Sequence, residues 1–366
     1  MALNKIKQIV ELGQSIWLDS FDREMLDSGK LKNMIEEYGI SGITSNPSIF
    51  EKAINNSADY DEDIRALLSM RKNPDELFFT LAVKDIQRAC DLFDPIYSKT
   101  NGQDGFASIE VSPHLAHDTD GTIRQARELW QAVNRKNAMI KIPATTEGLA
   151  AIRKCTSEGI NVNITLLFGL TRYTEVIEAY LSGLEERIKL NKPVDHIKSV
   201  ASFFLSRIDV LIDPVLKSKA LEDLKGEVAI ASACKAYEIY KNIFFSERFN
   251  ALEGKGAKRQ FLLWASTSTK DPAFSDTKYI SALIGPETIN TVTPETLAAF
   301  YDHGHPESHL VDGIAKATEV LLSLKKANID IDSVTQRLEN EGIEKFNLAY
   351  DDITRSIMKK QAGQTA

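Results

Sequence analysis

The feature that most constrains the fold is a regular alternation of short apolar runs with longer helical patterns. The runs are five to eight residues long, are rich in Ile, Val, Leu and Phe, and occupy residues 15–20, 42–47, 106–113, 138–144, 161–168, 199–206, 261–266 and 289–293. Most do not alternate between apolar and polar residues, which is typical of strands in a parallel sheet covered on both faces. Amphipathic helical patterns lie between them, as the crossover connections of a parallel sheet require.

Eight strand–helix units favour a closed (β/α)₈ barrel over an open sheet. The α/β barrel commonly takes about 250 residues and tolerates insertions, and the first run is not followed by the GxGxxG of a dinucleotide-binding sheet. We expect additional helices after the second and sixth strands. Residues 1–366 are expected to form one barrel domain, with 304–366 as a helical extension that packs on the barrel near its mouth.

Charge and cysteine content exclude several classes of protein. The net charge is −8, and no basic block is longer than a short pair such as Lys258-Arg259, so the clustered basic surface of a nucleic-acid-binding protein is missing. The three cysteines, Cys90, Cys155 and Cys234, form no CxxC pair and suit a reducing compartment. Neither a signal peptide nor an apolar run long enough for a membrane span is found. We therefore expect a cytoplasmic enzyme or binding protein without a membrane partner.

Polar side chains recur in the second half of the predicted strands. In a barrel the carboxyl ends of all strands converge on one mouth, so distant residues come within reach of one small molecule. The residues concerned are Asp19, Asn46, Glu110, Lys141, Asn163, Thr165, Ser202 and Ser266. The pattern predicts a small-molecule site at the mouth.

Lys141 is the most unusual of these residues because it lies in the middle of the apolar stretch AMIKIPAT. A lysine is almost never fully buried unless it is paired, because its ammonium group loses hydration. A desolvated lysine gives up its proton more readily, and the free amine attacks a ketone or aldehyde to form a Schiff base. Glu110 and Asp19 are the carboxylates available to move the protons that this chemistry requires.

Some of these residues also have simpler interpretations. Asn46 precedes Pro47 and could shape a turn, and Asp19 could cap the following helix. Ser202 and Ser266 could be small packing residues. These alternatives stay open at this stage.

A metal-dependent aldolase is a further alternative. The segment HGHPESH places three histidines within seven residues, and two more follow the third strand, namely His303, His305, His309, His114 and His117. Histidines at such spacing can ligate zinc. The segment also contains Gly304 and Pro306 and is predicted to be a loop, so we expect no metal site.

Six motifs, in this order and spacing, resemble those of the transaldolase family of Schiff-base-forming enzymes. They are TSNPS, SIEVSP, IKIPAT, NVNITLLF, SFFLSRID and WASTS, and the resemblance extends from Trp17 to the C-terminal helices. The chain looks like the longer bacterial type. The resemblance implies a (β/α)₈ barrel that needs no metal or organic cofactor. The implied reaction, in the non-oxidative pentose phosphate pathway, moves a dihydroxyacetone unit from sedoheptulose 7-phosphate to glyceraldehyde 3-phosphate, giving erythrose 4-phosphate and fructose 6-phosphate.

The same resemblance assigns catalytic roles to four residues. Lys141 would form the Schiff base with the C2 carbonyl of the donor sugar. Glu110 would move protons through a water that Thr165 helps to hold, and Asp19 would deprotonate the C4 hydroxyl.

Substrate-binding roles follow from the resemblance for a second group. Asn46, Asn163 and Ser202 would bind the hydroxyls of the dihydroxyacetone unit, and Phe204 would form an aromatic wall. Arg207 and Ser266 would bind the phosphate, and the planar fork of an arginine suits a pair of phosphate oxygens.

The chain departs from the family at two positions. Many members have an arginine just after the serine of the seventh strand, whereas this chain reads ASTSTK, so Lys270 is the candidate replacement. Many members have a proline after the serine of the sixth strand, where this chain has Phe203.

Two further alternatives share this barrel. One is an aldolase that releases free dihydroxyacetone, and the other is a sugar-phosphate-binding protein without activity, since a fold alone does not establish activity. The second is disfavoured because Lys141, Glu110 and Asp19 are all present. The expected partners are sugar phosphates, and a homo-oligomer is possible.

Overall fold

A computed structural model describes residues 4–69 and 73–362. Eight parallel strands form a closed barrel in which each strand pairs with the next along the chain and the eighth pairs with the first. All eight predicted strands are confirmed, and the barrel is of the predicted (β/α)₈ class. They are β1 (Gln14–Leu18), β2 (Gly42–Thr44), β3 (Phe106–Glu110), β4 (Ala138–Pro143), β5 (Val162–Leu167), β6 (Ser199–Phe204), β7 (Phe261–Ala265) and β8 (Thr288–Val292).

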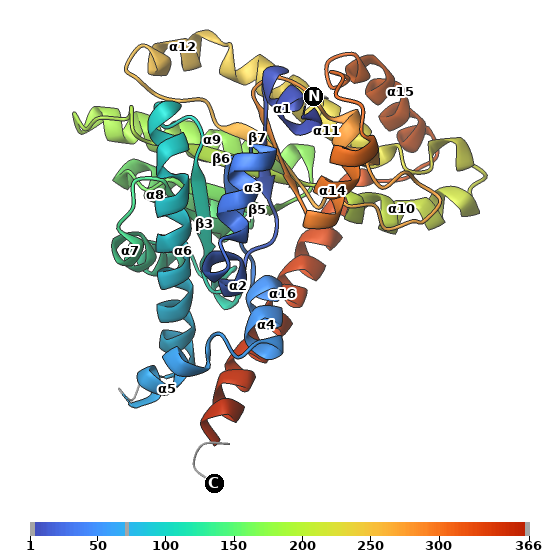
Figure 1. Cartoon of the computed structure of the whole chain (residues 1–366). Helices are drawn as coiled ribbons and strands as arrows, with labels where there is room; N and C mark the ends of the chain where they lie inside the picture. The colour runs from blue at the N-terminus through green and yellow to red at the C-terminus, as the bar shows by residue number, and fades with distance from the viewer. Residues whose placement is uncertain (1–3, 70–72, 363–366) are drawn as a thin grey trace.

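Helices cover the outside of the barrel and extend beyond it (Figure 1). Those before β5 are α1 (Lys5–Glu11), α2 (Arg23–Asp27), α3 (Lys30–Tyr38), α4 (Pro47–Asn56), α5 (Asp61–Ser69), α6 (Pro74–Lys99), η1 (Pro113–Leu115), α7 (Thr119–Val133) and α8 (Thr146–Glu158). Those after β5 are α9 (Leu170–Lys189), α10 (Ser206–Ser218), η2 (Glu222–Leu224), α11 (Val228–Phe244), α12 (Glu247–Glu253), α13 (Lys278–Ala282), α14 (Pro294–His303), α15 (Gly313–Lys326) and α16 (Ile331–Ala362).

Two of the amphipathic patterns between the strands, over residues 23–39 and 227–252, each predict one helix, but the structure divides each of them in two. The pattern over 23–39 forms α2 and α3, because Gly29 adopts a φ of 74° that lies in the left-handed region favoured by glycine. The pattern over 227–252 forms α11 and α12, because Ser246 leaves the helical conformation and its hydroxyl accepts the Phe249 amide as an N-cap. Apolar periodicity alone does not reveal such breaks.

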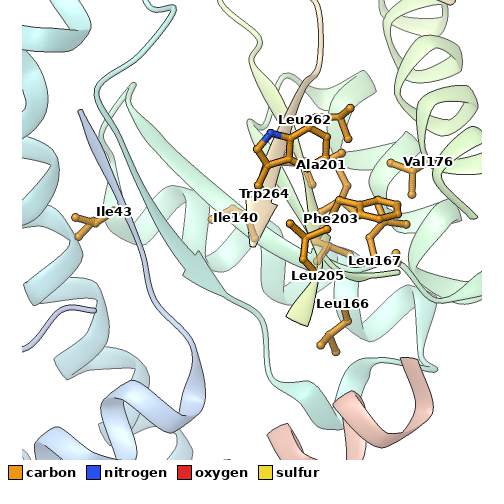
Figure 2. Close-up of a cluster of buried hydrophobic side chains, with 14 of the residues drawn as sticks. Ile43, Ile140, Leu166, Leu167, Val176, Ala201, Phe203, Leu205, Leu262 and Trp264 are labelled. Carbon is orange, nitrogen blue, oxygen red and sulfur yellow. The ribbon is translucent and has the colours of Figure 1, made fainter. Parts of the chain in front are cut away.

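Side chains alternate between the barrel interior and the surrounding helices. One small cluster joins seven residues from six different strands, namely Trp17, Phe106, Met139, Val200, Leu263, Ala265 and Ile289. The neighbours of Lys141 in β4, Ile140 and Ile142, belong to the larger cluster shared with the helices. Figure 2 shows Phe203 beside Val176 of α9 in that larger cluster, and Trp264 packs edge-on against Phe203 with ring centroids 6.5 Å apart. Lys141 therefore points into the barrel, as its position in the strand predicts.

The two last helices lie in different places. α15 packs against α11 on the outside of the barrel. α16 runs past α4 towards the C-terminus (Figure 1) and also contacts η1, β5, α6 and α10. The two helices therefore pack on different parts of the barrel.

Within the described ranges, no helix combines the length and apolarity needed to cross a membrane. Cys90, Cys155 and Cys234 are buried free thiols.

Candidate active site

A cavity of about 910 Å³ opens at the carboxyl ends of the strands. Nine of the eleven predicted site residues line it, namely Asp19, Asn46, Lys141, Thr165, Ser202, Phe204, Arg207, Ser266 and Lys270. The other two, Glu110 and Asn163, lie next to it and contact residues that line it. The barrel thus brings all of the predicted residues to one place.

Lys141 is held at the wall of this cavity by two groups. Its Nζ lies 3.0 Å from Glu110 Oε2 and donates a hydrogen bond to the Ser45 carbonyl oxygen at 2.7 Å. Only 4% of the lysine is exposed. Burial raises the pKa of the Glu110 carboxyl, and the charge of Lys141 acts in the opposite direction.

Asp19 directly follows β1 and faces the same cavity. The Thr44 hydroxyl donates to Asp19 Oδ1 at 3.1 Å and also lies 3.2 Å from the Thr291 hydroxyl. Burial raises the pKa of Asp19, while Lys141 and the hydrogen bond from Thr44 act in the opposite direction. A carboxyl with a raised pKa is suited to accept a proton near neutral pH.

A chain of polar groups connects three strands beneath the cavity. The Ser202 hydroxyl donates to Asn163 Oδ1 at 2.7 Å, and Asn163 Nδ2 donates to Ser108 Oγ at 3.0 Å. Asn163 is fully buried, so its main contact here is with Ser202 rather than with the cavity. The buried hydroxyl of Thr165 has no hydrogen-bond partner among the described residues and is available to a ligand or water.

Asn46 has a structural task as well as a place in the cavity wall. It is the N-cap of α4, and its Oδ1 accepts the Ile49 amide at 3.1 Å. Its oxygen thus has a structural role, but as a helix cap and not in the turn that the simpler interpretation suggested. Its side-chain nitrogen is the group that remains for a ligand.

The β6–β7 side of the cavity is cationic. Arg207, in the first turn of α10, forms no hydrogen bond or ion pair with any residue that the structure describes, and burial lowers its pKa. Lys270 is exposed and donates to the Ser268 hydroxyl at 2.6 Å. A half-buried guanidinium without a partner is a ready site for an anion.

Ser266 sits beside Arg207 in an unusual backbone conformation. Its φ of 56° is in the left-handed region, where non-glycine residues are uncommon and often functional. Its hydroxyl lies 2.9 Å from that of Ser206, the first residue of α10. Four acidic residues from other parts of the chain also line the cavity, namely Asp22, Glu24, Asp59 and Glu295. An anionic group would therefore be directed to the β6–β7 side.

Several residues that line the cavity, or that contact a residue lining it, were not predicted from the sequence. Thr44, Ser45, Ser206 and Thr291 lie at strand ends or directly after them, so the rule that selected the other residues could have found them. Phe346 also lines the cavity, but it lies on α16, far along the sequence from any strand. Its burial is indicated only by the apolar stripe of that helix.

The histidines of the alternative metal site do not gather. His303 pairs with Asp276 and Asp302, and His309 pairs with Glu307. Over residues 4–69 and 73–362 no group of three or more His, Cys, Asp or Glu has the geometry to hold a metal ion.

Comparison with known proteins gives consistent matches along the chain. The family described as Transaldolase/Fructose-6-phosphate aldolase matches residues 16–357. A "Transaldolase" of Trichodesmium erythraeum is 48% identical over 373 residues, with 98% of each chain covered. A "Transaldolase 2" of a Nostoc species is 46% identical and a "Transaldolase" of Saccharopolyspora erythraea is 44% identical, both again with 98% of each chain covered.

Proposed function

The chain belongs to the Transaldolase/Fructose-6-phosphate aldolase family, and on this premise we propose that it is a transaldolase. It moves a dihydroxyacetone unit reversibly from sedoheptulose 7-phosphate to glyceraldehyde 3-phosphate, giving erythrose 4-phosphate and fructose 6-phosphate. The observation that carries this proposal is the position of Lys141, buried between Glu110 and Ser45 and facing a cavity that also contains Arg207.

The reaction begins with attack of the Lys141 amine on the C2 carbonyl of the donor. Glu110, at 3.0 Å, accepts the proton that the ammonium must lose, and then supplies a proton for the departure of water from the carbinolamine. The Thr165 hydroxyl is free to hold that water. The product is an iminium ion whose nitrogen withdraws electrons from the neighbouring carbon.

Cleavage of the C3–C4 bond requires a base at the C4 hydroxyl. Asp19 is the remaining carboxyl of the cavity that lies close enough to Lys141 for their charges to interact, and its raised pKa suits it to this role. The released aldehyde leaves a dihydroxyacetone enamine on Lys141. Addition of the enamine to the acceptor aldehyde reverses these steps.

The charge distribution of the cavity orients the substrate. Arg207 binds the phosphate with Lys270 and Ser266, while the carboxylates that line other parts of the cavity repel it. Ser202 and the nitrogen of Asn46 bind the hydroxyls near C1 and C3, and Asn163 orients Ser202 through their hydrogen bond. Phe204, which packs against Phe168, forms an apolar wall.

Trapping with borohydride tests the proposal. Fructose 6-phosphate and borohydride should leave a reduced three- or six-carbon adduct on the peptide that contains Lys141, and the Lys141→Ala variant should lose transfer activity and the adduct. Lys198 provides an internal control, because it is also buried and its pKa is lowered to about 7, yet it lies at the start of β6, at the other end of the barrel. An adduct on Lys198, or transfer by Lys141→Ala, would contradict the proposed mechanism.

The alternative of an aldolase that releases dihydroxyacetone uses the same residues. Product analysis with and without an acceptor aldose phosphate separates the two reactions. We expect rapid formation of the transfer product and slow release of free dihydroxyacetone.

A further inference from the structure

α16 is not part of the strand–helix repeat, yet residues of one of its faces lie at the mouth of the barrel. Its buried residues recur every three or four positions, as Leu338, Gly342, Phe346, Tyr350 and Ile353. Three of these, each one turn apart, lie against the barrel or line its cavities.

Gly342 meets the end of β5. A Cβ atom at this position would lie 2.9 Å from Leu166 Cδ2, so the helix approaches the strand more closely than a side chain would allow. Leu166 itself has a φ of 54°. In Figure 2 its side chain points away from the Phe203–Trp264 cluster towards a pale red helical segment, which is α16. The contact places α16 against the strand that carries Thr165.

Tyr350, two turns further on, lies beside β3. It lines a small enclosed cavity together with Glu110, Ser45 and Asn46. Phe346 lies between Gly342 and Tyr350 on the same face, is 4% exposed, and lines the main cavity with Lys141 of β4. The helix thus runs from the end of β5 towards the end of β3, and Phe346 is its contribution to the wall of the cavity that Lys141 faces.

Four contacts tie α16 to four different parts of the barrel. Glu339 pairs with Arg172 of α9 at 3.4 Å, and Asp351 pairs with His114 of η1 at 2.7 Å. The Tyr350 hydroxyl donates to Asp75 of α6 at 3.2 Å, and Lys360 donates to the Ser57 carbonyl oxygen at 3.2 Å. These contacts are spread over most of α16, so they hold the helix, and with it Phe346, in place against the cavity.

We infer that Phe346 determines whether the covalent intermediate is transferred to an aldehyde or lost to water. This inference rests on the proposed transaldolase function. In the loss reaction the enamine carbon takes a proton to give an iminium ion, water adds its oxygen to C2, and the C2–N bond breaks. Free dihydroxyacetone leaves, and Lys141 regains its amine. An apolar ring in the wall of this cavity excludes water from this step, while the aldehyde acceptor, held by its phosphate at Arg207, still reaches the enamine.

The experiment compares two rates in each variant. Release is measured as free dihydroxyacetone formed from fructose 6-phosphate alone, and transfer is measured as sedoheptulose 7-phosphate formed when erythrose 4-phosphate is added. We expect Phe346→Ala to raise the ratio of release to transfer at least fivefold and Phe346→Leu to raise it at least twofold. Leu348→Ala, on the exposed face of the same helix, should leave the ratio unchanged.

A second readout separates this role from a structural one. The covalent adduct is formed with fructose 6-phosphate, the sugar is removed, and samples are reduced with borohydride at intervals. The adduct should disappear faster in Phe346→Ala than in the wild type, by the same factor as the ratio. A proportional loss of release and transfer, with an unchanged adduct lifetime, overturns the inference. If Phe346→Ala does not fold, the ratio in Phe346→Leu decides the question alone. Absence of an adduct in the wild type would instead refute the proposed function.

Discussion

Lys141 Nζ and Glu110 Oε2 lie 3.0 Å apart because their residues are register partners on adjacent strands. A paired position fixes the Cα atoms across the ladder, and both side chains point into the barrel. The two groups are also almost completely buried, so their interaction is little screened by solvent. The distance is set by the backbone of the barrel and not by flexible loops.

The first prediction concerns the replacement of Glu110 by glutamine. If Glu110 moves protons, Glu110→Gln should reduce kcat by roughly 10²- to 10⁴-fold, while KM for fructose 6-phosphate changes by only a few fold, since general acid–base catalysis typically contributes this much. Steady-state kinetics measure both constants. A loss that appears mainly in KM would assign Glu110 to substrate binding.

The pH dependence of the reaction gives a second prediction. Burial raises the pKa of both Glu110 and Asp19, and each is needed as a carboxylate at one step. As pH falls, these groups therefore take up protons at a higher pH than ordinary carboxyls do, and kcat/KM should decline there. The charges of Glu110 and Asp19 interact. The decline of kcat/KM at low pH therefore reports apparent pKa values of the pair and not of either residue alone. In Asp19→Asn the residual activity should follow a single ionisation, and an unchanged profile would contradict the assignment.

The phosphate site gives a third prediction, which separates Arg207 from Lys270. Arg207 is half-buried and unpaired within the described part of the chain, whereas Lys270 is exposed. A charge-assisted hydrogen bond contributes about 1.5–3 kcal/mol. Arg207→Ala should therefore lower kcat/KM for fructose 6-phosphate about 100-fold, and Lys270→Ala less than about tenfold.

Unphosphorylated fructose is the control for this comparison. It lacks the group that the two cations bind, so both variants should process it at close to the wild-type rate. Equal losses with both sugars would show that Arg207 supports the structure of the cavity and not phosphate binding.

The barrel was predictable because apolar patterning reports directly on which strand faces are buried. Strand ends converge in this fold, so Lys141, Glu110 and Asp19 could be brought together from sequence alone. The role of the Asn46 oxygen as a helix cap could not be predicted from the sequence, because an asparagine before proline suits a turn, a helix cap or a ligand site. Phe346 was not predictable, since helical periodicity shows that a face is buried but not what it covers.

A fourth prediction concerns a buried ion pair beside the site. Arg23 donates to Asp85 Oδ1 through Nε at 3.0 Å and through Nη2 at 2.9 Å, and it lies 4.2 Å from the ring centroid of Tyr60. Removing one member of a buried pair leaves the other charge unsatisfied and costs about 3–5 kcal/mol. Asp85→Ala should lower the free energy of unfolding by this amount.

Asp63 provides the matched control for that measurement. It also pairs with Arg23, at 2.6 Å, but is more exposed and shares its charge with Lys84. Asp63→Ala should cost about 1 kcal/mol or less, as is usual for exposed pairs. Denaturant unfolding of both variants compares the two values, and similar losses would mean that burial does not set the strength of this cluster.

The fifth prediction concerns the dependence of stability on pH and rests on Asp209. This residue is 2% exposed, and its carboxyl accepts hydrogen bonds from the Ala229 amide at 2.8 Å and the Tyr279 hydroxyl at 2.7 Å. Burial raises its pKa to about 6, and the nearby Asp213 acts in the same direction. An aspartate in the unfolded chain has a pKa of about 3.9.

Between these two values the folded protein holds a proton that the unfolded chain has released. The free energy of unfolding therefore receives its full contribution from Asp209 below about pH 4 and loses it as pH rises to about 6, by roughly 3 kcal/mol. Asp209→Asn resembles the protonated carboxyl at every pH and should lack this loss. The variant should thus gain stability relative to the wild type between pH 4 and 7 in denaturant titrations, because it removes the cost of a buried charge. Parallel stability curves for the two proteins would show that Asp209 does not titrate in this range.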